Sequence, residues 1–120
     1  MKQYKLGEME TAFAEIIWDN APVTSGELVK LCEEKLDWKK STTYTVLKRL
    51  CEKGLFANNG GTVEVLIQRQ EFYTLQSRRF VAETFDGSLP AFLAAFTGGK
   101  RLKPEEVAQL RKMVDSYGEG

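Results

Sequence analysis

The stretch that decides the fold is Ser41-Thr42-Thr43-Tyr44-Thr45-Val46-Leu47-Lys48-Arg49-Leu50. At about 100° per residue, a helix divides this stretch into two faces. One face gathers the apolar residues and one threonine: Thr43, Val46, Leu47 and Leu50. The other face gathers hydroxyl-bearing and cationic residues. We therefore predict a helix over residues 40–53 that lies half in the core and has Gly54 as its C-cap.

The predicted solvent face of this helix has the chemistry of a DNA reader. Short hydroxyls let a helix approach base edges, and threonine methyls suit the thymine methyl. The sequence predicts base readout by Ser41, Thr42, Tyr44 and Thr45. It predicts phosphate contacts, which set the register on DNA, by Lys39, Lys40, Lys48 and Arg49. The alternative is a solvated helix that tolerates β-branched residues on its surface, although such residues are poor helix formers.

The surrounding sequence predicts a winged helix-turn-helix. Apolar residues at helical spacing indicate helices over residues 7–19 and 25–36, and Thr24 with Glu27 forms a capping box at the start of the second. After the third helix, residues 55–57 and 62–67 predict a hairpin, whose tip Asn58-Asn59-Gly60-Gly61 carries no cation. Three helices and this wing predict a mostly α (α+β) fold, with a DNA-binding domain at residues 1–69.

Residues 70–120 predict a helical tail that dimerises. Three apolar helices are expected, over residues 70–85, over residues 89–96 and from Pro104 onward. A segment this small seldom builds a sufficient core alone. It therefore needs a second copy of itself, or it forms one larger monomeric helical domain with the rest of the chain. For the dimer, the expected interface residues are Phe72, Phe80, Phe85, Leu89, Phe92, Leu93, Phe96, Val107, Leu110 and Val114.

Composition narrows the possible functions. The 17 basic and 17 acidic residues cancel, which argues mildly against nucleic-acid binding. Between residues 38 and 54, however, five cations oppose only Glu52. The chain has no histidine, and Cys32 and Cys51 form no metal or redox motif, so we expect no cofactor, no metal site and no enzyme activity. No apolar run is long enough for a membrane span or a secretory signal, so we expect a cytoplasmic protein.

The sequence resembles the BlaI/MecI/CopY, or penicillinase repressor, family along nearly its whole length. The resemblance is carried by Leu6-Gly7-Glu8-Met9-Glu10 with Ile16-Ile17-Trp18, by Trp38 with Thr42, Thr45, Leu47, Arg49, Leu50, Lys53 and Gly54, by Phe80 through Phe85-Asp86-Gly87-Ser88-Leu89, and by Leu102 with Glu105-Glu106. It implies a homodimeric winged-helix repressor that binds a dyad DNA operator ahead of resistance or metal-homeostasis genes. The alternative is an adaptor that has kept the fold but binds a partner protein.

The resemblance also implies how such repressors are released. In the β-lactam branch a membrane sensor protease triggers cleavage of an Asn-Phe bond in the tail. The matching position here is Ala95-Phe96, so the first residue departs from that pattern. The copper branch uses C-terminal cysteines, and this sequence has none after Cys51.

Overall fold

A computed structural model describes residues 6–118, so the first five and the last two residues of the predicted domains lie outside it. The chain forms two compact units that divide between Arg79 and Phe80. We describe each unit by itself. This division falls ten residues after the predicted boundary between residues 69 and 70, and the assignment of DNA binding and dimerisation to separate domains stays a prediction.

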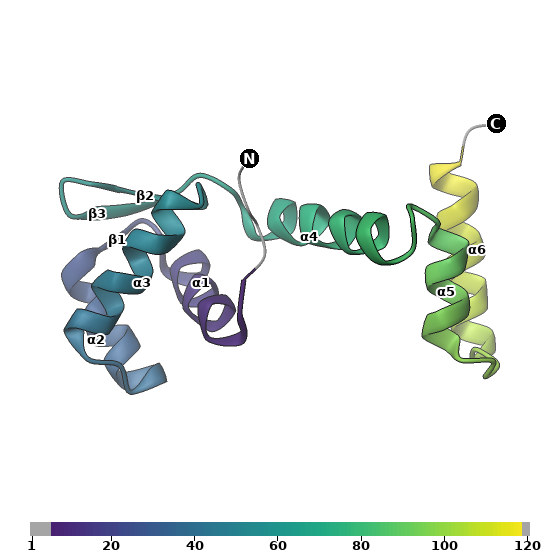
Figure 1. Cartoon of the computed structure of the whole chain (residues 1–120), viewed down its shortest axis with the longest axis horizontal. Helices are drawn as coiled ribbons and strands as arrows, with labels where there is room; N and C mark the ends of the chain where they lie inside the picture. The colour runs from purple at the N-terminus through teal and green to yellow at the C-terminus, as the bar shows by residue number, and fades with distance from the viewer. Residues whose placement is uncertain (1–5, 119–120) are drawn as a thin grey trace. The chain divides into compact units, whose positions relative to one another are not determined.

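The N-terminal unit contains three helices, a small sheet and the start of a fourth helix (Figure 1). Its elements are α1 (Glu8–Asn20), β1 (Val23–Thr24), α2 (Ser25–Leu36), α3 (Lys40–Glu52), β2 (Phe56–Asn59), β3 (Thr62–Val65) and the first part of α4 (Arg69–Thr84). The sheet is antiparallel in the order β1-β3-β2, with Val23 opposite Val63 and Asn59 opposite Thr62. This is the predicted α+β winged-helix fold.

The residues at the start of α2 and at the end of α3 act much as the sequence predicts. The Thr24 hydroxyl accepts from the Glu27 N–H at 3.1 Å, and the Glu27 carboxylate accepts from the Thr24 N–H at 3.4 Å, which completes the capping box of α2. Lys53 is the C-cap of α3, and Gly54, the predicted C-cap, lies one residue beyond it at a φ of +88°, a conformation that favours glycine over residues with a Cβ. The hairpin differs from the predicted bounds at both strands. Asn58 and Asn59 belong to β2, so the turn consists of Gly60 and Gly61, and β3 ends at Val65 instead of residue 67.

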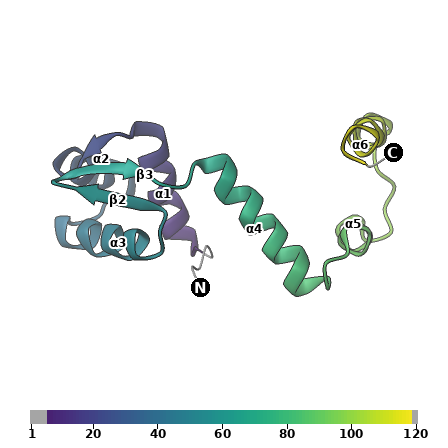
Figure 2. The same ribbon diagram turned by 90° about the horizontal axis from the view of Figure 1, so that it is seen from above.

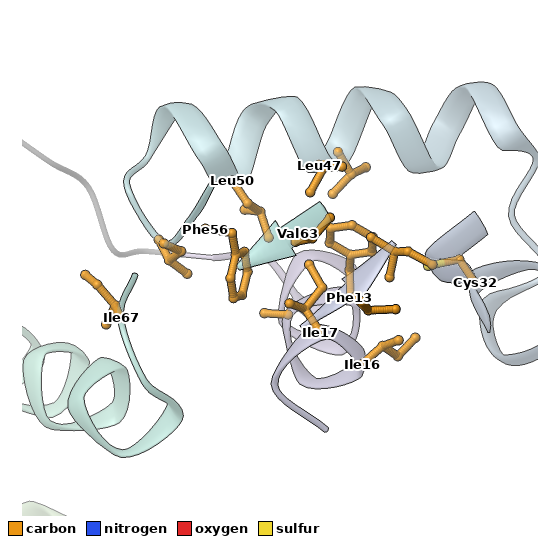
Figure 3. Packing of buried hydrophobic residues seen from close by; sticks show 14 of the residues in the cluster. Phe13, Ile16, Ile17, Cys32, Leu47, Leu50, Phe56, Val63 and Ile67 are labelled. Atoms are coloured by element: carbon orange, nitrogen blue, oxygen red, sulfur yellow. The ribbon is translucent and has the colours of Figure 1, made fainter. Parts of the chain in front are cut away.

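The core of this unit joins α1, α3 and the sheet. Leu47 and Leu50 point from α3 toward Phe13 and Ile17 of α1, with Val63 of β3 between them (Figure 3). All five side chains are at most 2% exposed. Burial of each large apolar side chain stabilises the fold by about 1.5–3 kcal/mol. The same burial fixes how α3 is turned about its own axis.

The first turns of α4 are held against α1. Arg69 forms an ion pair with Glu15 at 2.8 Å and a second with Asp19, and its guanidinium lies over the Trp18 ring. The hydrogen bonds that the Arg69 guanidinium donates to Asp19 and Glu15 raise the pKa of Arg69. The Tyr73 hydroxyl donates to Glu15 at 2.8 Å, which raises the pKa of Tyr73.

Phe72, which the sequence analysis assigned to the dimer interface, lies instead in the core of the N-terminal unit. Its side chain is 0% exposed and its ring packs 5.4 Å from the Trp18 ring, centroid to centroid. A side chain that is already covered offers no surface to a second chain. The error arose because Phe72 shares a helix with exposed apolar residues that begin two turns later.

The C-terminal unit contains the end of α4, α5 (Leu89–Thr97) and α6 (Pro104–Tyr117) (Figures 1 and 2). Ser88 caps α5 by accepting from the Ala91 N–H at 3.1 Å. An aromatic cluster joins α4 and α5, with neighbouring ring centroids 5.6 to 6.1 Å apart: Phe80, Phe85, Phe92 and Phe96. Neither α5 nor α6 has a fully buried side chain within the single chain.

Candidate nucleic-acid interface

The exposed side of α3 carries all six of the predicted DNA-contacting residues that lie between Ser41 and Arg49. The buried residues of α3 are Thr43, Val46, Leu47 and Leu50. The exposed residues are Ser41, Thr42, Tyr44, Thr45, Lys48 and Arg49. The helical period therefore brings together on one solvent face the residues that the sequence predicted would read bases.

The hydroxyls on this face are not equivalent. The Thr45 hydroxyl donates to the Ser41 carbonyl at 2.9 Å, so its oxygen can still accept while its proton is engaged. The Thr45 methyl stays available for an apolar contact. The Tyr44 hydroxyl donates to Ser25 at 3.2 Å, which directs the ring toward the start of α2. Sequence reasoning did not identify Ser25, because no linear pattern connects it with Tyr44.

Positive charge concentrates at the first turn of α3. Lys39 is the N-cap residue and Lys40 is the first helical residue, and both side chains are exposed. The helix macrodipole adds a partial positive charge of about half a unit at the same end. Backbone phosphates are therefore attracted to this end of the helix. Lys48 supplies a further exposed cation two turns later.

Arg49 lies in a different environment from the three lysines. Its guanidinium is 3.7 Å from the Glu10 carboxylate of α1, and the Lys53 ammonium is 3.4 Å from the same oxygen. The Arg49 side chain is still 53% exposed. The sequence alone does not reveal this contact of Glu10, because Glu10 lies on another helix, 43 positions before Lys53.

The wing adds no positive charge to this surface. The Asn58 side chain accepts from the Gly61 N–H at 3.1 Å, and the Asn59 amide donates to Glu64 at 3.1 Å. These bonds order the hairpin tip from within. The Gly61 carbonyl accepts from the Ser25 N–H at 2.8 Å, which joins the tip to the start of α2.

Neither cysteine presents a reactive thiolate. Cys32 is buried and Cys51 is half-buried, and both are free thiols. Burial raises the pKa of each thiol, so both stay protonated at neutral pH. Within residues 6–118, no three His, Cys, Asp or Glu side chains come together as a metal site would require.

The sequence matches the penicillinase repressor family over residues 6–116. The chain belongs to this family. Among its relatives, the penicillinase repressor of Bacillus licheniformis is 23% identical over 117 residues, which cover 94% of this chain and 91% of that protein. The methicillin resistance regulatory protein MecI of Staphylococcus aureus (strain Mu50) is 21% identical over 118 residues, covering 95% and 96%. MecI of Mammaliicoccus sciuri is 20% identical over the same coverage.

Members of the penicillinase repressor family are transcriptional regulators that bind DNA, and they are not enzymes. This chain is accordingly a DNA-binding repressor with a winged-helix fold. Across residues 6–118, none of the helices has the length and apolar character that a membrane crossing needs.

Proposed function

We propose that this protein is a sequence-specific repressor that binds a dyad operator as a homodimer, with α3 in the major groove. The observation that carries the proposal is the exposed face of α3, where Ser41, Thr42, Tyr44 and Thr45 gather while the opposite face is held by the core. In this proposal the four residues read bases. Lys39, Lys40, Lys48 and Arg49 contact phosphates and set the position of the helix on the duplex.

The dimer is proposed from the apolar surface of the C-terminal unit. Phe96 is 70% exposed, Val114 66% and Leu89 57% in the single chain. A groove between α5 and α6 is lined mostly by apolar side chains, among them Phe92, Phe96 and Met113. A second copy would cover this surface, and two-fold symmetry would present two α3 helices to two half-sites. Within the predicted dimerisation domain of residues 70–120, the part from Phe80 onward would then form the interface, because the residues up to Arg79 belong to the N-terminal unit.

The regulated genes are proposed from the relatives, two of which are named for penicillinase and methicillin resistance. We propose operators ahead of genes for resistance to β-lactams. The matching cleavage position, Ala95-Phe96, lies on α5, and both residues are exposed in the single chain. Release by a membrane sensor protease stays a prediction. Ala95 stands where the family pattern has Asn.

Selection of binding sites from random duplexes tests the proposed function. The purified protein should enrich a dyad whose half-site centres lie about one helical turn, or 10–10.5 base pairs, apart or a multiple of this. Enrichment of no dyad would contradict sequence-specific repression. A dimer without any salt-dependent DNA affinity would favour the protein-binding adaptor instead.

Substitution of Phe96 tests the dimer. Because Phe96 is largely exposed within one chain, Phe96→Asp should leave the fold intact but place two charges in the shared apolar surface. The variant should be monomeric by sedimentation at a concentration where the wild type is dimeric. Lys100→Asp, an exposed change in the turn that follows, should stay dimeric. Equal masses for the wild type and Phe96→Asp would place the interface elsewhere.

A comparison of Thr45→Ala with Lys48→Ala tests the division of roles on α3. Loss of a base contact should weaken operator binding by about 1–3 kcal/mol and leave non-specific binding nearly unchanged. Loss of a phosphate contact should weaken both and reduce the slope of log K against log salt by about one. Affinities are measured on operator and scrambled duplexes over a salt series. Equal losses for the two variants on both duplexes would refute these roles.

A further inference from the structure

Glu10 of α1 faces the C-terminal end of the proposed DNA-reading helix. One carboxylate oxygen lies 3.4 Å from the Lys53 ammonium and 3.7 Å from the Arg49 guanidinium. The Glu10 side chain is only 17% exposed, whereas that of Arg49 is 53% exposed. The Glu10 carboxylate is thus largely enclosed, whereas the Arg49 side chain is accessible to solvent.

The other carboxylate oxygen of Glu10 has a separate role. It accepts from the Gly7 N–H at 3.1 Å and so caps α1, whose N-cap glycine has no side chain to do this. Burial alone would raise the pKa of Glu10, but the Gly7 N–H, Lys53 and Arg49 together lower it below its usual value. Glu10 is therefore negatively charged at neutral pH beside two cations of α3.

A carboxylate and a DNA phosphate compete for the same N–H donors of a guanidinium. Both accept charge-assisted hydrogen bonds from its N–H groups. Arg49 must therefore loosen its pairing with Glu10 before it can contact a phosphate fully. A partly exposed ion pair of this kind contributes about 0–1 kcal/mol, so the competition is modest but measurable.

We propose that Glu10 is a positioning residue that limits the affinity of the repressor for the DNA backbone. It occupies Arg49 and Lys53 as an internal counter-anion, and its own charge opposes nearby phosphates. The effect is independent of base sequence, so operator and non-specific DNA are weakened alike. The inference rests on the proposed role of α3 in DNA binding.

Glu10→Gln is the decisive variant, because glutamine keeps the oxygen that caps Gly7 and removes only the charge. It should bind both operator and scrambled duplexes more tightly, by about two- to fivefold. The dependence of affinity on salt should steepen, with a slope up to about one unit larger. Glu8→Gln is the matched control, since Glu8 is an exposed acid in the same first turn and its loss changes the net charge equally.

A second substitution identifies the cation that is released. Arg49→Gln in the wild type should weaken binding to scrambled duplex less than Lys48→Gln does, because Glu10 already engages Arg49. In the Glu10→Gln background, Arg49→Gln should remove most of the gain. Urea unfolding checks that each variant is folded under the assay conditions. The comparison of Arg49→Gln with Lys48→Gln in the wild type does not involve Glu10→Gln and so does not depend on its stability.

The outcomes separate this inference from the proposed function. An affinity gain in Glu10→Gln that exceeds the gain in Glu8→Gln and is lost with Arg49→Gln supports it. A wild type that binds DNA, together with a Glu10→Gln variant that binds no more tightly than Glu8→Gln, overturns this inference alone. A wild type with no DNA affinity at any salt concentration overturns both.

Discussion

The structure depends on the packing of one side of α3 against α1 and β3. Leu47 and Leu50 lie in the same core as Phe13, Ile17 and Val63, and they can do so in only one rotation of the helix about its axis. Once that rotation is fixed, the period of the α-helix decides which residues face solvent. The hydroxyl-bearing face is therefore a consequence of core packing, and no separate contact is needed to orient it.

Much of this architecture could be predicted from sequence, because it depends on local signals. The capping box of α2, the glycine after α3 and the two glycines of the hairpin each act within a few residues. The division of α3 into buried and exposed faces follows from the same short-range periodicity. All four α3 residues predicted to be in the core are buried in the structure.

The contacts that sequence could not predict join residues that are far apart along the chain. Lys53 and Glu10 are separated by 43 positions, and Tyr44 and Ser25 by 19. Phe72 shows the same limit, since periodicity marks it as apolar but does not say which apolar surface it joins. The zero net charge of the chain also says little about DNA binding, because it does not show where the charges lie. Glu10 lies beside the cations at the end of α3, whereas Lys39 and Lys40 are exposed at its start.

The most direct test of this account is an NMR titration of the labelled protein with its selected operator duplex, followed through amide and methyl signals. The account predicts the largest shift changes at Ser41, Thr42, Tyr44 and Thr45, with smaller changes at the buried Val46 and Leu50. Largest changes in the β2–β3 hairpin, with the signals of α3 unmoved, would contradict it.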